Sequence, residues 1–445
     1  METKMEEQEE QSPRPVSAAG VSDATVSVEG RVVEATRDGL TELHKRFLST
    51  SVLPKDRGLW FFLKPQPTGW TDGGGHFLWN RGSGTIIDPG RGFLDSLATA
   101  GGMLTEVRNI VITHDNESQL SEFETIRKLL LQGKHWESNL TNNIRFFLNL
   151  GAIQKLSATV DLNDKAFSEG YLTLYPGADY DLLGGGKIKA LPAYHQEFKS
   201  ADQAVGLQIS LDANSGPSGG SGAVKKIVYT SDTGLFPLAP SYDHAENRIV
   251  YVSDKNQTNR ILSSRYKDEG AENADLMILH FGQANIRFDK NQPPAIKVDE
   301  MQSIDPANRP NEKQLAELCA VGQLGFLGTR NMVEQCRPKF AVICQWAKEL
   351  GPLRMELSKL LQNQIGPEST KLVAGDRFLI YDIFTDAVYD CVKDGWTAAR
   401  DITAADWEGQ LFYFAEETRN SFESLPDYYV NRFLNDLKYK QNTYF

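Results

Sequence analysis

Five acidic and imidazole side chains stand at the ends of apolar runs in this chain. Asp88 follows one run, His114 a second, His195 a third and Asp232 a fourth, and His280 is the last residue of a fifth. Imidazole and carboxylate groups are the usual ligands of a catalytic zinc ion. These residue types therefore raise the question of whether the chain performs metal-assisted chemistry.

Each of the five residues also has an ordinary structural explanation. His114 fits a strand-end histidine that is hydrogen-bonded to the backbone, and His195 fits a surface loop residue. Asp232, in Ser-Asp-Thr-Gly, fits a turn former. His280 fits a satisfied core histidine. We expect Asp88 to support the loop geometry through hydrogen bonds rather than to touch a substrate.

The apolar runs predict the strands that position these side chains. Strands are expected at residues 59–63, 76–80, 84–87, 107–113, 187–192, 205–211, 226–230, 274–280 and 339–344. Helices are expected at 93–99, 120–131, 312–321 and 352–362, and a hairpin at 370–381 with its turn at Gly375-Asp376. This order fits two sheets packed face to face with helices outside.

Composition and charge exclude several classes of protein. The net charge of −12 disfavours a general nucleic-acid binder. No apolar run approaches the ~18–20 residues of a membrane span. Cys319, Cys336, Cys344 and Cys391 form no CxxC pair, so we expect reduced thiols in a cytoplasmic protein rather than disulfides or a cysteine-based metal site. The sequence contains no P-loop, no GxGxxG after a strand and no GxSxG.

Five segments, in order and at plausible spacing, resemble the metallo-β-lactamase superfamily. They are 84–90 with Asp-Pro-Gly, 112–119 with Thr-His, 191–195, 227–234 with Ser-Asp-Thr-Gly, and 323–343. Residues 274–280 also resemble the "ADLLIHE" strand of the nuclease-like branch of that superfamily. The resemblance covers about residues 75–385 and implies an α+β fold, an αββα sandwich.

The resemblance also implies two metal sites, most of whose ligands are substituted here. Carried over position by position, the first metal would take His114, Asn116 and His195. The second would take Ser118, Gln119, Asp232 and Gln323, with Asp232 bridging both ions. Ser118 replaces the aspartate that positions the attacking water. Neutral oxygen donors bind zinc more weakly than imidazole or carboxylate, so the resemblance predicts a degraded His-x-His-x-Asp-His motif.

The sequence thus predicts three regions. Residues 1–25 are expected to be a disordered acidic tail, 26–386 the metallo-β-lactamase-like domain with an insertion at about 130–185, and 387–445 a helical C-terminal extension. Asp88, Asn116, Ser118, Gln119, His280 and Gln323 are expected to line the pocket.

Three functional hypotheses remain open. The favoured one is a non-catalytic relative without a cofactor, which binds a small ligand or a protein partner in the old cleft or through the added helices. The second is a mononuclear hydrolase, nuclease-like or a phosphodiesterase, with one zinc or manganese ion on His114, His195 and Asp232. The third is a function unrelated to that superfamily. In none of them do we expect membrane binding.

Overall fold

The computed structural model of the protein describes residues 53–400 with gaps, chiefly at 64–73, 137–143, 163–167, 196–203, 213–223, 289–295 and 299–310, and short stretches between 39 and 48. The chain divides into two units, Met1–Arg46 and Phe47–Phe445. The tail predicted at 1–25 and residues 401–445 of the predicted extension lie outside the described residues. Within the described part, none of the helices combines the length and apolar character needed to cross a bilayer.

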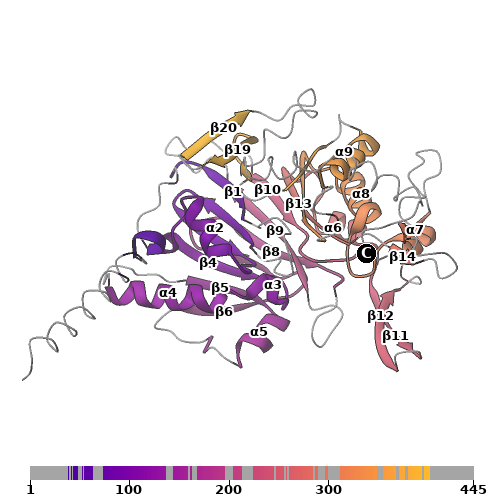
Figure 1. Ribbon diagram of the computed structural model, residues 1–445, viewed down its shortest axis with the longest axis horizontal. Coiled ribbons are helices and arrows are strands. Elements are labelled where there is room, and N and C mark those ends of the chain that lie inside the picture. Colours follow the sequence, from indigo (N-terminus) through magenta and orange to yellow (C-terminus); the bar gives the residue numbers. More distant parts are fainter. Residues whose placement is uncertain are drawn as a thin grey trace, which may run out of the picture. The chain divides into compact units, whose positions relative to one another are not determined.

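Most described strands of the second unit belong to two large sheets (Figure 1). The nine-stranded sheet has the order β20 (Gly395–Arg400), β19 (Ala387–Val392), β18 (Leu379–Asp382), β1 (Gly58–Phe62), β2 (His76–Asn80), β3 (Ser83–Ile87), β4 (Val107–Ile112), β5 (Ile144–Asn149), β6 (Ser168–Leu174). The seven-stranded sheet has the order β17 (Lys371–Ala374), β16 (Phe340–Trp346), β13 (Leu276–Gly282), β10 (Val224–Tyr229), β9 (Val205–Asp212), β8 (Lys187–Pro192), β7 (Asp179–Asp181).

Helices connect the parallel strands and cover the sheets. Strands β3 to β6 run parallel, as do β10, β13, β16 and β17, and parallel pairs need crossover connections. Beside the first sheet lie α2 (Phe93–Thr99), η2 (Leu104–Glu106), α3 (Glu117–Leu120), α4 (Phe123–Trp136) and α5 (Leu150–Leu156). Beside the second lie α6 (Leu262–Asp268), α7 (Glu312–Leu318), α8 (Gly325–Cys336) and α9 (Arg354–Ile365).

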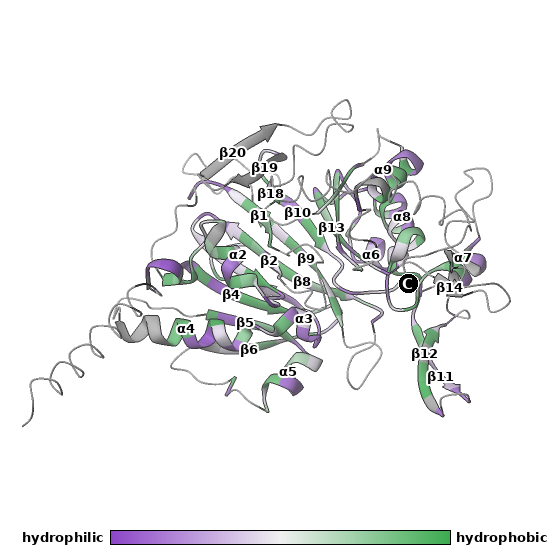
Figure 2. Cartoon of the chain, viewed as in Figure 1, coloured by the Kyte–Doolittle hydropathy of each residue, from purple (hydrophilic) through white to green (hydrophobic). Residues whose placement is uncertain are grey.

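Three hydrophobic cores separate these layers. One lies between the two sheets, and the others lie between each sheet and its helices, so the strands are apolar on both faces. Figure 2 shows much of these strands in green, the colour of hydrophobic residues. On β2, for example, Phe77 and Trp79 pack toward the helices while Leu78 packs between the sheets. His76, two residues before Leu78, faces the same interior because side chains alternate along a strand.

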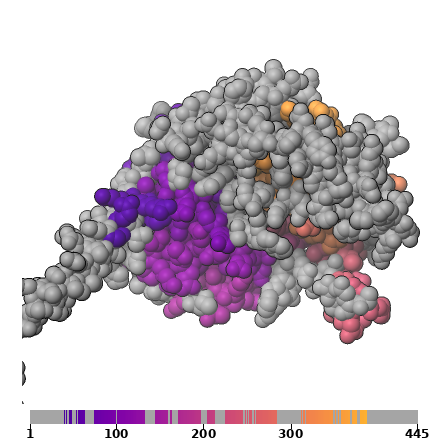
Figure 3. Space-filling model, viewed as in Figure 1, coloured from indigo at the N-terminus to yellow at the C-terminus, as the bar shows by residue number. Residues whose placement is uncertain are grey.

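The remaining elements are small. Strands β11 (Leu238–Asp243) and β12 (Arg248–Ser253) pair with each other, as do β14 (Ile286–Phe288) and β15 (Ile296–Val298), and η1 spans His44–Leu48. In the space-filling view the purple to magenta part of the second unit gathers in one region, and the β11–β12 hairpin lies at the lower edge (Figure 3).

Two sequence expectations differ from the structure, and the segment of a third is described beside them. The hairpin predicted at 370–381 is wrong: β17 pairs with β16 in one sheet and β18 with β1 in the other. Within the segment predicted as an insertion at about 130–185, β5, β6 and β7 extend the two sheets. Residues Ala387–Val392 and Gly395–Arg400 form strands β19 and β20 rather than helix. In each case local composition indicated a turn or an element, whereas strand pairing across the fold decided its partner.

Candidate metal centre

The centre is built where β3 and β4 end side by side. Asp88 follows β3 and is fully buried. Its Oδ1 accepts the backbone N–H of Thr113 (2.8 Å), and its Oδ2 accepts the hydroxyls of Thr113 (2.6 Å) and Tyr229 (2.7 Å). Burial raises the pKa of Asp88, although the charge of His114 and these hydrogen bonds act to lower it. Asp88 thus holds the loop that presents His114, which is the supporting role expected from the sequence.

His114, His195 and Asp232 converge although they come from three distant segments. Their ligand atoms all lie within 4.8 Å of one another. His114 Nε2 lies 3.0 Å from Asp232 Oδ2, and the rings of His114 and His195 meet edge to face with centroids 5.5 Å apart. Among the described residues, this is one of two groups of histidine, cysteine or acidic residues that could hold a metal ion.

In both His114 and His195, Nδ1 is hydrogen-bonded, and this holds the orientation of the ring. His195 Nδ1 donates to the carbonyl of Gly322 (3.1 Å), so the Nε2 lone pair faces the amide of Asn116 at 3.3 Å. His114 Nδ1 lies 3.1 Å from the hydroxyls of both Thr113 and Ser231. Metal-ligating histidines almost always have such an outer hydrogen bond.

Asp232 lies between two imidazoles. Its Oδ1 accepts the Nδ1–H of His280 (2.7 Å), and its Oδ2 faces His114 and, at 3.4 Å, the Gln345 amide. Burial by itself would raise the pKa of Asp232. The charges of His114 and His280 and their hydrogen bonds outweigh burial, and they hold this pKa well below its usual range. Asp232 is therefore a carboxylate at neutral pH.

Burial has the opposite consequence for His195. It lowers the pKa of this imidazole, and the nearby charge of Asp232 only partly opposes the effect. His195 is therefore neutral near pH 7, which is the protonation state that a metal ligand requires.

The other predicted pocket residues lie in two places. Ser118, half-buried, and Gln119, fully buried, belong to the short helix α3. The amide oxygen of Gln323 accepts the backbone N–H of Gln283, and it is the neighbouring Gly322 that reaches the centre through its carbonyl. Of the four positions implied for a second metal, Asp232 alone carries a carboxylate or imidazole.

Sequence reasoning did not identify Ser231 and Gln345 as members of the centre. Both have left-handed backbone conformations, with φ of 57° and 55°, and Asp88 does too, with φ of 51°. For non-glycine residues such conformations cost about 1–3 kcal/mol each and cluster at functional sites. No pattern in the sequence predicts that Ser231 and Gln345 belong to the centre, because their positions depend on strands β10 and β16 ending beside β4.

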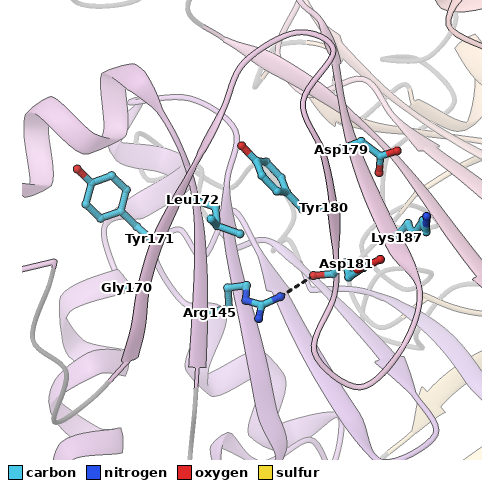
Figure 4. Close-up of a pocket in the computed structure, with 8 residues that line it drawn as sticks. All are labelled: Arg145, Gly170, Tyr171, Leu172, Asp179, Tyr180, Asp181 and Lys187. Carbon is cyan, nitrogen blue, oxygen red and sulfur yellow. Dashed lines mark hydrogen bonds between the residues drawn. The ribbon is translucent and has the colours of Figure 1, made fainter.

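A cavity of about 540 Å³ opens at another part of the sandwich, where β5 and β6 of one sheet approach β7 and β8 of the other (Figure 4). Arg145 and Tyr180 lie on its wall, and the Arg145 guanidinium donates to the carbonyl of Asp181 at 2.9 Å. Of the described residues that line it, none belongs to the predicted site.

Comparisons with known proteins give structural matches alone. No protein-family model matches the chain, and no curated protein does. The metallo-β-lactamase fold protein YhfI from Bacillus subtilis aligns over 73% of this chain and 99% of its own, at 10% identity and a TM-score of 0.45. The metallo hydrolase Igni18 from Ignicoccus hospitalis aligns over 72% and 96%, at 13% identity and a TM-score of 0.38. The short form of human tRNase Z aligns over 73% and 99%, at 12% identity and a TM-score of 0.38.

The order of layers is helix, sheet, sheet, helix. This is the αββα sandwich that the sequence resemblance implied, so the expected fold class is confirmed.

Proposed function

We propose that this chain, which has a metallo-β-lactamase-like fold, binds one divalent metal ion through His114, His195 and Asp232 and acts as a mononuclear hydrolase. The observation that carries the proposal is the convergence of these three side chains to within 4.8 Å, with both imidazoles oriented by outer hydrogen bonds. Side chains that only terminate strands have no reason to share this arrangement.

The donor set fits a zinc-class ion. Two imidazoles and one carboxylate are a known ligand set of catalytic zinc, with the fourth position open. An ion held at about 2.0–2.2 Å needs the three ligand atoms roughly 3.3–3.6 Å apart, slightly closer than their 4.8 Å limit. The ion would take the place of the His114–Asp232 hydrogen bond, and His114 would transfer its remaining proton to Nδ1, beside the hydroxyls of Thr113 and Ser231.

A metal ion bound here would supply a Lewis acid and a water acidic enough to react near neutral pH. The chain itself supplies the surroundings. The amides of Asn116 and Gln345 border the ligand atoms and can donate to oxygens of an ester or phosphodiester substrate. Because Ser118 stands where the resemblance implies the water-positioning aspartate, we expect slow turnover.

A second candidate, the non-catalytic protein favoured from the sequence, rests on a different observation. Both oxygens of Asp232 already face imidazole nitrogens, at 2.7 and 3.0 Å. The cluster is therefore satisfied as a hydrogen-bonded network, and it can persist as a binding pocket for a small ligand or partner without any metal.

The experiment that separates the two candidates is metal analysis combined with an activity assay. Protein purified without added metal, and a zinc-reconstituted sample, are compared with His195→Ala and with the exposed His244→Ala as a control. The hydrolase proposal expects zinc on the wild type and on His244→Ala, and a loss of one equivalent together with loss of hydrolysis of a nitrophenyl phosphodiester in His195→Ala. Zinc content that is unchanged by His195→Ala would overturn the metal centre. Zinc binding without hydrolysis would contradict the hydrolase, and protein that neither binds zinc nor hydrolyses the diester would favour the non-catalytic candidate.

A further inference from the structure

A second group of metal-binding side chains lies inside the sandwich. His76 from β2, His280 from β13 and Cys344 from β16 are buried, and their ligand atoms all lie within 4.8 Å of one another. Cys344 forms no disulfide with another of the described cysteines. The sequence analysis predicted His280 as a residue of the cleft pocket, and it favoured reduced thiols over a cysteine-based metal site.

Strand register explains why these three meet. His280 and Cys344 are direct partners in the parallel β13–β16 ladder, so their side chains lie on the same face of the sheet. Cys344 belongs to the core between the sheets. His76 enters that core from the opposite sheet, and its ring stacks on that of His280 with centroids 6.0 Å apart. Two sheets therefore contribute ligands to one point.

The hydrogen bonds set the protonation of both imidazoles. A carboxylate oxygen accepts, so the 2.7 Å contact with Asp232 Oδ1 puts a proton on His280 Nδ1, and Nε2 is the nitrogen left for a metal ion. This carboxylate–histidine arrangement is the one that usually supports a metal ligand. His76 Nδ1 accepts the indole N–H of Trp60 at 3.1 Å, and a metal on His76 must displace or rearrange that bond.

We propose that His76, His280 and Cys344 form a second, buried site for a thiophilic metal ion of the zinc class. Thiolate and imidazole are the donors that such ions select. The thiolate of Cys344 and the carboxylate of Asp232, one imidazole away, together balance the charge of a divalent ion, which a buried cation requires. Bond lengths of about 2.0–2.3 Å need the ligand atoms to close only modestly from their 4.8 Å limit.

The competing explanation is core packing. His76 also meets the rings of Trp60, Phe62 and Tyr229 at centroid distances of 5.2–5.6 Å, as a neutral aromatic side chain would. Packing predicts no bond between a metal and sulfur, whereas the proposed site requires one. The distinction is spectroscopic and does not depend on catalytic activity.

The test uses Co²⁺ as the probe on the full-length chain, loaded during expression because the site is buried. The expected result is thiolate-to-cobalt charge-transfer absorption in the near ultraviolet. It should be present in wild type and in the control Cys336→Ser, which changes another buried cysteine that forms no disulfide, and absent in Cys344→Ser. It should persist in His195→Ala, since the His114–His195–Asp232 centre contains no cysteine, so that failure of either proposal is visible separately.

A wild-type protein without this band, or a band that survives Cys344→Ser, would overturn the buried site. Because Cys344→Ser can also perturb the core, X-ray absorption on the zinc-loaded wild type gives an independent measurement. A sulfur neighbour at about 2.3 Å is expected, and a shell of nitrogen and oxygen alone would contradict the proposal.

Discussion

Replacing Asp232 by Asn should weaken zinc binding at the His114–His195–Asp232 centre at least about 100-fold while leaving the protein folded. An Asn side chain at this position can still accept the Nδ1–H of His280 through its oxygen. Its NH₂ group can donate to His114 Nε2 once the His114 proton moves to Nδ1, where the Ser231 and Thr113 hydroxyls lie at 3.1 Å. The hydrogen bonds are thus conserved in number, and the negative charge is lost.

The magnitudes follow from what each variant leaves unpaired. For metal-free protein we expect Asp232→Asn to lower the free energy of unfolding by about 1–2 kcal/mol, mainly from weaker neutral hydrogen bonds. Asp232→Ala leaves the buried Nδ1–H of His280 and the Nε2–H of His114 without their acceptor, so roughly 2–4 kcal/mol is expected. Loss of the carboxylate should weaken zinc binding at least about 100-fold, or about 2.7 kcal/mol, in both variants.

Urea unfolding of chelator-treated protein and zinc titration with a chromophoric competitor measure these quantities separately. The reasoning is refuted if Asp232→Asn keeps wild-type zinc affinity, because the carboxylate is then no ligand. It is also refuted if Asn destabilises the fold as much as Ala, because the proposed exchange of donors and acceptors then does not occur.

Three further outcomes are expected. Glu122 accepts the backbone N–H groups of Gly92 and Leu94 at the start of α2, so Glu122→Ala should cost about 1–2 kcal/mol in urea unfolding, whereas Glu124→Ala, on an exposed ion pair with Lys128, should cost under about 0.5. Burial of Asp275 acts to raise its pKa, but the hydrogen bonds from Lys339 and the Lys226 backbone and the charge of Lys225 lower this pKa overall. The stability that ionised Asp275 contributes is therefore present above the unfolded pKa of 3.8 and is lost as the pH falls below 3.8. The difference in unfolding free energy between wild type and Asp275→Asn should shrink between pH 6 and pH 3. A Cβ on Gly75 would lie 2.4 Å from the carbonyl oxygen of Asp88, so Gly75→Ala should lower both the unfolding free energy and the zinc affinity, and a variant with wild-type zinc affinity would show that Asp88 does not position the centre.

The sequence was sufficient to predict the strands that carry the centre because their apolar runs have clear ends. Strands β2 and β8 begin and end at the predicted residues, and β4 and β10 end one residue earlier than predicted. The resemblance then supplied the order of His114, His195 and Asp232, whose convergence the structure displays. What it could not supply was partner choice, as β17 and β18 show, since both faces of each strand are apolar and either sheet can accept them.

The group of His76, His280 and Cys344 could not be predicted from the sequence, for a related reason. His76 and Cys344 lie 268 positions apart in the sequence, and neither belongs to a motif. They meet because the two sheets stack, and because these positions of β2, β13 and β16 place their side chains on the faces between the sheets. A shift of one residue in β2 would turn His76 toward the helices.

Asp232 connects the two groups through its two carboxylate oxygens. One oxygen faces the His114–His195 centre, and the other orients His280 for the interior. A single negative charge therefore serves both places. A divalent ion in one group withdraws electron density from the carboxylate and weakens its hold on the other, so the two proposed sites compete for the same anion. Without a metal ion in either group, the hydrogen bonds of His114 and His280 satisfy the Asp232 carboxylate and hold these side chains in place.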